Sequence, residues 1–396
     1  MIPKLNPELA LDASIVAFSK ALLAAGFSGD IETSYGSRLA VATDNSVYQA
    51  LPQAVLLPKT TDDLVILTSL AQTSSFCHIK FSPRGGGTGT NGQALTEHVV
   101  IDLSRHMRGI LELNVEQRWV RVQAGVIKDQ LNAFLKPYGF FFAPDLSTSN
   151  RATIGGMINT DASGQGSLVY GKTSDHVLAL KTVLIDGTIL KTHKIATFEA
   201  EHRAEMPNSI GRIYRQVLDS CRDFRPQILE KFPRLNRFLT GYDLEHVFNE
   251  DLSEFDLSRI ITGSEGSLGF VTEAKLNITP IAKFKCLINV KYDRFESALR
   301  NAPFLVAAQA TSVETVDSKV LNLARNDIIW HQVKELITDI PNTEMQGLNM
   351  VEYNSENQAE IEEKVAALTA KLDLAIANNT DGIIGYQLTY DTAAIG

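Results

Sequence analysis

The 396-residue sequence lacks several features that would assign it to a large protein class. Its three cysteines, Cys77, Cys221 and Cys286, are far apart, and their odd number provides neither a disulfide framework nor a C-x-x-C metal site. No stretch approaches the roughly 20 apolar residues of a transmembrane helix, and the N-terminus has no continuous apolar core like that of a signal peptide. We therefore expect a cytoplasmic protein in a reducing environment, without a transmembrane segment.

Excess positive charge is also absent. The formal net charge is −9, which argues against a nucleic acid or an anionic membrane surface as a partner. An anionic ligand would therefore have to be held by local donors. The length is sufficient for two or three domains, and neither an internal repeat nor a low-complexity linker marks their boundaries.

Glycine, in contrast, is concentrated in a few segments. The first, SPRGGGTGTNG, runs from Ser82 to Gly92 and contains five glycines in eleven residues. Without a Cβ, glycine lets backbone N–H groups approach a ligand closely, and successive N–H groups form a concavity that binds anions. This composition predicts a nucleotide-binding loop, although a flexible hairpin accounts for the glycine content equally well.

Two common nucleotide motifs do not fit this segment. Gly87, Gly89 and Gly92 match G-x-G-x-x-G, but the chain continues into a predicted strand at residues 98–103 and not into the helix of a Rossmann turn. A P-loop requires a lysine directly after the glycines, and none follows. The remaining interpretation is a loop between two strands that holds the diphosphate of a different cofactor.

Two further segments are rich in small residues. Residues 143–167 contain mostly Gly, Ser, Thr and Asn, which by itself is typical of a surface loop. Residues 261–280 place a glycine turn before a predicted strand at 270–278. Several such segments in one chain favour closure over one elongated, polyphosphorylated cofactor, with Ser and Thr hydroxyls as donors.

The periodicity of apolar residues predicts the surrounding elements. Helices are expected at residues 9–26, from Thr60 onward, and at 126–135, 296–306 and 356–376. Strands are expected at residues 54–57, 78–81, 98–103, 119–123 and 286–290, with a hairpin turn at Asp186-Gly187. Residues 191–258 are charged and partly helical, which indicates an insertion.

In this order, the three segments resemble the FAD-binding domain shared by vanillyl-alcohol-oxidase-type and p-cresol-methylhydroxylase-type flavoproteins. The matching stretches are Pro83–Gly89, Pro144–Gly164 and Gly263–Ala274. The GYDL of Gly241–Leu244 and the stretches NTDASGQGS and KTSDH are similar to D-2-hydroxy-acid dehydrogenases, and most of all to the large bacterial D-2-hydroxyglutarate dehydrogenases, which join an FAD module to an iron–sulfur module. The sequence departs from this family at Asp161, where asparagine is common, and in the long insertion.

The resemblance implies an α+β protein, with a two-subdomain FAD-binding fold of the p-cresol-methylhydroxylase type followed by an incomplete α/β substrate (cap) domain. The expected parts are an N-terminal helical segment at 1–45, a first FAD-binding subdomain at 46–107, a second at 108–280 containing the insertion 191–258, and a partial substrate domain at 281–396. On this interpretation the chain is the N-terminal part of a longer protein.

The resemblance also implies a set of cofactor-binding residues. The first segment would hold the FAD diphosphate, the second would line the flavin and shape the groove, and the third would close it near the adenine half. The residues concerned are Arg84, Gly85, Gly86, Gly87, Thr88, Gly89, Thr90, Pro144, Leu146, Ser147, Thr148, Ile154, Gly155, Gly156, Asn159, Ala162, Gly164, Glu265, Gly266 and Val271. Some family members tether flavin through a histidine in the first loop; Thr88 and Thr90 stand there in this chain, so non-covalent FAD is expected.

The implied activity is oxidation of a D-2-hydroxy acid, most of all D-2-hydroxyglutarate, by hydride transfer to flavin, with electrons passed to an unidentified acceptor other than NAD. Two alternatives remain: a non-catalytic FAD-binding fragment or assembly protein, and an NADPH-dependent reductase of the same fold. The expected partner is the small hydroxy acid, and the oligomeric state, including a homo-oligomer, is left open.

The sequence assigns no catalytic residue and no metal ligand. The G-H-x-x-x-x-x-x-H-type segment that carries the metal ligands of the resembled dehydrogenases does not occur. His98, His106, His176 and His246 are better explained as structural or solvated residues, although His176 lies near the predicted flavin. The cysteines cannot provide C-x₂-C-x₂-C spacing, so an iron–sulfur cluster is expected only in a C-terminal part absent from this chain.

Overall fold

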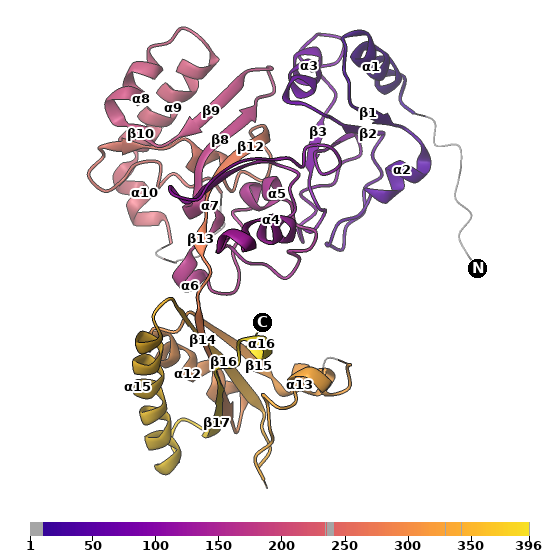
Figure 1. Ribbon diagram of the computed structural model, residues 1–396. Helices are drawn as coiled ribbons and strands as arrows, with labels where there is room; N and C mark the ends of the chain where they lie inside the picture. The colour runs from indigo at the N-terminus through magenta and orange to yellow at the C-terminus, as the bar shows by residue number, and fades with distance from the viewer. Residues whose placement is uncertain (1–10, 234, 236–240, 329, 342, 396) are drawn as a thin grey trace, which may run out of the picture. The chain divides into compact units, whose positions relative to one another are not determined.

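The computed structural model describes residues 11–233, 235, 241–328, 330–341 and 343–395. The chain forms two compact units (Figure 1). The first contains the described residues up to Ser163 together with Lys172–Thr279, and the second contains Gly164–Gly171 together with the described residues from Pro280 onward. Mixed helices and strands confirm the expected α+β class. The four predicted domain ranges stay predictions.

The first unit begins with a four-stranded sheet in the order β1-β2-β4-β3. Its strands are β1 (Asp30–Glu32), β2 (Ala54–Leu57), β3 (Phe81–Arg84) and β4 (Val99–Asp102). β2 and β3 both pair with β4 in parallel, whereas β1 pairs with β2 in antiparallel fashion. The chain leaves β3 directly into the glycine-rich loop, as the sequence predicts.

Two helices that the sequence predicts pack against this sheet. Helix α1 (Ala13–Ala24) lies within the predicted range 9–26, of which residues 9 and 10 are outside the described part of the chain. Helix α3 (Thr61–Ala71) begins after Thr60, whose hydroxyl accepts a hydrogen bond from the N–H of Asp63. The short helix α2 (Tyr35–Ala40) completes this part. The buried faces of α1 and α3 share one core with β2 and β4.

One predicted strand is wrong. Residues 78–81 were expected to be extended, but the chain forms turns through His78, where the N–H groups of Phe76 and Cys77 both donate to the carbonyl of Thr73. The strand begins only at Phe81 and includes Pro83. Proline is tolerated there because β3 lies at the edge of its sheet, where one row of backbone groups has no ladder partner.

The second sheet of this unit has five antiparallel strands in the order β5-β6-β12-β8-β9. These are β5 (Ile110–Asn114), β6 (Trp119–Gln123), β8 (Val177–Val183), β9 (Ile189–His193) and β12 (Phe270–Asn277). The predicted strands at 119–123 and 270–278 and the hairpin at Asp186-Gly187 are confirmed. Packed on it are α4 (Lys128–Leu135), the 3₁₀ turn η1 (Lys136–Tyr138), β7 (Phe140–Phe141), α5 (Ile154–Asn159) and α7 (Thr173–His176).

The predicted insertion is partly helical, as expected, and has its own core. It contains β10 (Ile195–Ala196), α8 (Thr197–Ala204), α9 (Ser209–Asp223), α10 (Arg225–Lys231) and β11 (Glu254–Phe255), followed by α11 (Ser258–Ile261). Tyr214, Leu218 and Phe255 are fully buried within this cluster. The two-residue strand β13 (Thr279–Pro280) lies where the first unit ends.

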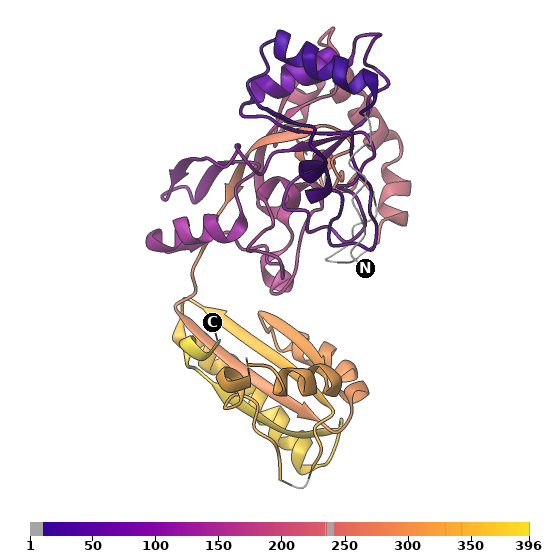
Figure 2. The ribbon, with the colours of Figure 1, turned by 90° about the vertical axis from the view of Figure 1, so that its right-hand side faces the viewer.

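The second unit is a four-stranded antiparallel sheet in the order β15-β16-β14-β17, with α12 and α15 covering the face that carries its main core (Figure 2). The strands are β14 (Phe284–Tyr292), β15 (Ser312–Asp317), β16 (Gly347–Ser355) and β17 (Ile383–Thr389). The helices are α6 (Ser167–Tyr170), α12 (Phe295–Ala307), α13 (Ser318–Arg325), α14 (Trp330–Val333), α15 (Gln358–Ala377) and α16 (Thr392–Ile395). No helix in the described ranges is long and apolar enough to cross a membrane.

Candidate cofactor site

All three glycine-rich segments line one cavity of about 360 Å³ in the first unit. This cofactor cavity lies beside the end of β3, the start of α5 and the turn that precedes β12. Its lining residues are Pro83, Arg84, Gly85, Gly86, Gly87, Thr88, Gly89, Thr90, Asn91, Gln93, Ala94, Leu103, Ala124, Leu146, Thr148, Ala152, Thr153, Gly155, Gly156, Met157, Asn159, Thr160, Ala162, Ser163, Glu265, Gly266 and Val271. Segments separated by up to about 180 residues in the sequence thus share one concave surface.

The first segment provides a loop of nearly bare backbone. Gly87 has φ +63°, a conformation that is unfavourable for residues with a Cβ, so a side chain there would be strained. The Arg84 guanidinium donates to the backbone carbonyls of Val41 (3.2 Å) and Thr43 (2.8 Å), and burial lowers the pKa of this group. Arg84 therefore braces the loop, and backbone N–H groups remain as its main donors to an anion.

The second segment forms a short helix that the sequence did not predict. Thr153 caps α5 by accepting a hydrogen bond from the N–H of Gly156 at 3.2 Å. Gly155 donates from its own N–H to the carbonyl of Ala124, and a Cβ at Gly155 would lie 2.8 Å from the Ala124 methyl. A small residue is required at this position because the helix approaches the end of β6 so closely.

The third segment lies directly against the first. A Cβ on Gly266, which has φ +75°, would overlap the ring of Pro83. The N–H of Glu265 donates to the carbonyl of Asn159 at 2.8 Å, which ties the third segment to the second. The Glu265 side chain is exposed, yet partial desolvation by the surrounding protein raises the pKa of its carboxyl group. Among the described residues that line the cavity, Arg84 is the cation and Glu265 is the acid.

Most of the residues predicted to bind the cofactor line this cavity, and four do not. Ile154 is fully buried in the core of the five-stranded sheet, Pro144 is also buried, and Ser147 is exposed. Gly164 belongs to the second unit. The ligand contacts of all the predicted residues stay predictions.

The sequence reasoning missed several lining residues. Thr153 and Thr160 flank α5, and their position beside the predicted glycines was a usable signal. Leu103 and Ala124 come from the ends of two different strands, and only the packing of the sheets brings them to the cavity.

The histidines considered as candidates do not line the cavity. His176 is buried with its ring 5.8 Å from that of Phe142, and His106 contacts the Asp30 carboxylate at 2.7 Å. His246 contacts Asp243, and the N–H of His98 donates to the hydroxyl of Thr96. Within the described ranges, no group of three or more His, Cys, Asp or Glu residues could hold a metal ion.

Comparison with known proteins assigns a chemistry to this geometry. Residues 52–193 match the model of the FAD binding domain family, and residues 281–394 match that of the FAD linked oxidases, C-terminal domain. The first match contains the first two glycine-rich segments. The cavity suits that cofactor, because Gly85, Gly86, Gly87, Gly89, Gly155, Gly156 and Gly266 all line it and leave much of its wall as backbone without side chains.

Several curated proteins are similar over the entire chain. D-2-hydroxyglutarate dehydrogenases from Pantoea ananatis (strain AJ13355) and Escherichia coli (strain K12) are 58% and 57% identical over 395 residues, covering 100% of this chain but 39% of each relative. Glycolate oxidase subunit GlcD from Bacillus subtilis (strain 168) is 27% identical over 69% of this chain and 47% of its own length. The chain thus spans about two fifths of the dehydrogenases it matches.

A solved structure of alkyldihydroxyacetonephosphate synthase shares the fold, with a TM-score of 0.66 at 17% identity, covering 92% of this chain and 60% of that one. At this identity the likeness concerns the fold alone. Together with the matching domains it confirms the expected FAD-binding fold of the p-cresol-methylhydroxylase type.

Proposed function

This chain belongs to the FAD-linked oxidases, whose two domains it carries, and from that premise we propose that it is the FAD-binding portion of a dehydrogenase that oxidises D-2-hydroxyglutarate to 2-oxoglutarate. The observation that carries the proposal is the convergence of three glycine-rich segments on one cavity. The choice of substrate rests on the names of relatives with 57–58% identity over the whole chain.

The residues of the cavity would hold FAD without a covalent bond. Backbone N–H groups of residues 85–90 would donate to the diphosphate, because Arg84 is engaged with backbone carbonyls. Leu146, Thr148, Gly155, Gly156, Asn159 and Ala162 would line the flavin, and Glu265, Gly266 and Val271 would lie near the adenine half. When bound, FAD supplies the acceptor for the hydride that leaves Cα of the hydroxy acid.

The rest of the chemistry requires groups that the cavity does not present. Oxidation of a 2-hydroxy acid also needs an acceptor for the hydroxyl proton and cations for the substrate carboxylates. Among the described residues, the cavity lining contains one cation and no histidine. We propose that the remaining portion of the longer relatives supplies these groups, and that electrons leave through an iron–sulfur module located there to an acceptor other than NAD.

The proposal is tested by anaerobic mixing of the purified, FAD-loaded protein with D-2-hydroxyglutarate while the visible flavin absorbance is recorded. Parallel samples receive L-2-hydroxyglutarate or NADPH. Because the proton acceptor and the cations for the substrate are proposed to lie in the remaining portion of the longer relatives, we expect the flavin in this portion alone to stay oxidised. Bleaching by the D acid alone would support the dehydrogenase assignment and show that this portion already contains the catalytic groups, and bleaching by NADPH would favour a reductase. Failure to bind FAD at all would overturn the proposal.

A further inference from the structure

A second cavity of about 360 Å³ lies behind one side of the cofactor cavity. Its lining residues are glycines or carry a polar group, and they are Thr160, Asp161, Lys172, Gly241, Tyr242, Asp243, Thr262, Gly263, Ser264, Glu265 and Ser267. Thr160 and Glu265 line both cavities, and we call these two residues the dividing wall.

The wall is held by backbone hydrogen bonds at the end of α5. The chain leaves this helix through Asp161, whose φ of +46° is in the left-handed region. The turn leaves the last carbonyls of the helix available: the N–H of Gly263 donates to Ile158 and that of Glu265 donates to Asn159, each at 2.8 Å. The third glycine-rich segment is therefore positioned by a backbone conformation that is unfavourable for most residues, although aspartate tolerates it.

The Asp161 carboxylate is fixed by two hydrogen bonds and an ion pair. It accepts hydrogen bonds from the backbone N–H (2.8 Å) and hydroxyl (3.1 Å) of Ser174 and forms an ion pair with Lys172 at 2.8 Å. Both charged side chains are 7% exposed. An ion pair this deeply buried is strongly destabilised when one partner is removed, because the other charge is left uncompensated.

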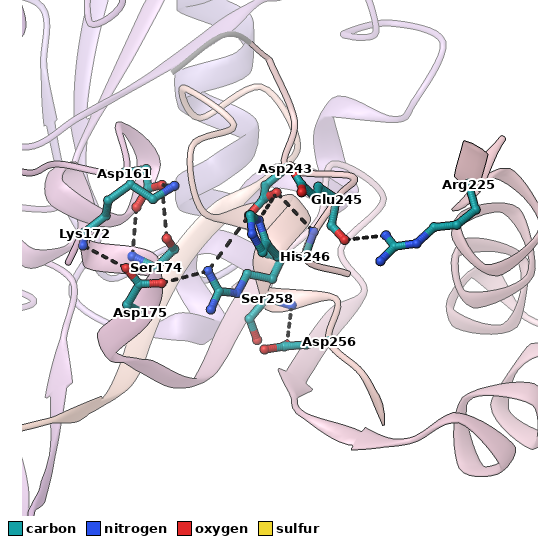
Figure 3. A network of polar contacts seen from close by, with 11 residues as sticks. Asp161, Lys172, Ser174, Asp175, Arg225, Asp243, Glu245, His246, Asp256 and Ser258 are labelled. Carbon is teal, nitrogen blue, oxygen red and sulfur yellow. Dashed lines mark hydrogen bonds and ion pairs between the residues drawn. The ribbon is translucent and has the colours of Figure 1, made fainter. Parts of the chain in front are cut away.

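The ion pair continues into the network drawn in Figure 3. Asp175 accepts from the backbone N–H of Lys172 and contacts Arg259 at 3.2 Å, and Arg259 reaches Asp243 at 3.9 Å. Asp243 also contacts the ring of His246 at 2.8 Å. Burial alone would raise the pKa of Asp243, but the contacts with His246 and Arg259 hold it below its usual value.

The network also fixes the GYDL segment against the wall. Tyr242 hydrogen-bonds the hydroxyl of Ser267 through its phenol at 2.9 Å, and the Ser267 hydroxyl donates to the carbonyl of Ser264, which precedes Glu265. Asp243, the next residue, is held by the ionic contacts described above. The GYDL segment thus forms one side of the second cavity, and Tyr242 is linked through Ser267 to the residue that precedes Glu265 of the dividing wall.

We propose that Asp161 is a positioning residue for the cofactor: through its ion pair with Lys172 and its left-handed turn it holds Thr160 and Glu265 in the conformation that accepts FAD. The proposal rests on the proposed FAD site. It also explains how aspartate can occupy position 161, where asparagine is common in the resembled family. The positive charge of Lys172 compensates the negative charge of the aspartate.

The test compares FAD affinity in Asp161→Ala, Asp161→Asn and the double variant Asp161→Asn with Lys172→Met, by titration of FAD into apoprotein at a temperature where each variant is folded. We expect Asp161→Ala to raise the FAD dissociation constant by on the order of tenfold or more. Asp161→Asn should be milder, because asparagine tolerates the turn and can still accept from Ser174, and removing the lysine charge as well should restore affinity to within about threefold of wild type.

Asp63→Asn is the matched control. Asp63 is equally buried, accepts hydrogen bonds from three backbone N–H groups in the same unit, and lines neither cavity. It should lower the melting temperature without weakening FAD binding. Equal FAD affinities in wild type and Asp161→Ala, or equal losses in Asp161→Ala and Asp63→Asn, would overturn the positioning role. If Asp161→Ala does not fold, the double variant decides. The positioning role would be overturned if the double variant bound FAD no more tightly than Asp161→Asn. A wild-type protein that binds no FAD would instead overturn the proposed function.

Discussion

The two units of the molecule differ in one respect: among the described residues, only the first has a buried non-glycine residue in the left-handed backbone region. In the second unit, Gln309, Asn379 and Asp381 have positive φ, but all three are exposed and lie in turns after helices α12 and α15. In the first unit, Arg118, Leu252 and Glu265 also have positive φ at exposed positions, whereas Asp161 has this conformation while it is 5% exposed and beside a cavity. A strained residue at an exposed helix end only reverses the chain, whereas one that is buried beside a cavity must be held by specific contacts.

Buried polar groups show the same contrast. In the second unit, the Asn349 amide donates to the phenol oxygen of Tyr292 and the carbonyl of Ala298, and accepts from the hydroxyl of Thr315. This cluster lies between β14, β16 and α12, and neither of the two cavities described above contains any of its residues. In the first unit, the Asp161–Lys172 pair faces the second cavity. The buried polar cluster of the second unit therefore packs inside the protein, whereas the Asp161–Lys172 pair borders a cavity.

The largest expected effect is on FAD binding when a glycine of the first unit is replaced. Gly87→Val places a β-branched residue at φ +63° inside the cofactor cavity, and we expect FAD affinity to fall by on the order of a hundredfold or more. Gly382→Val in the second unit is the matched comparison, because Gly382 has φ +67° and a Cβ there would overlap Asp293 and Ser297. FAD titration should find its affinity unchanged despite lower stability.

A neutral glycine substitution completes that comparison. Gly36 has an ordinary φ and no atom within 4 Å of an added Cβ, so Gly36→Ala should alter neither FAD affinity nor the melting temperature appreciably. If Gly382→Val weakened FAD binding as strongly as Gly87→Val, the effect of a strained residue on FAD binding would not depend on the unit in which it lies. That result would contradict the contrast drawn between the two units.

Core truncation in the second unit is expected to lower stability without affecting the cofactor. Ile288 is fully buried on β14, and Ile288→Ala should reduce the free energy of unfolding by about 2–5 kcal/mol, because it leaves a cavity in the core. Urea unfolding followed by circular dichroism measures the loss. Leu299→Ala, at a half-exposed site on α12, should cost less than about 0.5 kcal/mol. A large rise in the FAD dissociation constant for Ile288→Ala would contradict the expectation that the core of the second unit contributes to stability and not to FAD binding.

Removal of one hydroxyl tests the polar cluster of the second unit. The Tyr292 phenol donates to Asn301 and accepts from Asn349, and burial raises its pKa well above the usual range. Tyr292→Phe should cost about 1–3 kcal/mol, since two amides lose a partner inside the protein. Tyr386→Phe, whose hydroxyl meets Asp373 at the surface, should cost clearly less in the same urea experiment. Equal losses would show that burial does not set the cost.

The smallest effect is the acid dependence of the first unit. Burial alone would raise the pKa of Asp63, but hydrogen bonds from Ser28, Lys59 and Thr60 outweigh it and lower the pKa. A depressed pKa in the folded state contributes stability that is fully present above the unfolded value of about 3.9 and is lost as the pH falls through the folded value. Asp63→Asn should therefore flatten the stability profile below about pH 4, and an unchanged slope in acid unfolding would contradict this assignment.

The elements with regular periodicity were predictable, and the cavity was predictable in part. Strand β6 and helix α12 match their predicted ranges closely, because alternation and helical spacing reflect burial on one face. The turns before Phe81 and the helix α5 were not predicted, since their short segments lack a periodic pattern. Three glycine-rich segments indicated a cofactor, but Leu103 and Ala124 carried no signal of their own.

The sequence by itself determined the composition of the site: three segments with little side-chain volume and a family resemblance that assigned FAD to them. Only the tertiary structure decided that Thr160 and Glu265 separate two cavities and that Asp161, Lys172 and Asp243 hold this wall. The physical reason is that glycine acts through what it lacks, which is visible in a sequence, whereas an ion pair acts through the distance and burial of two groups, which depend on how the chain folds.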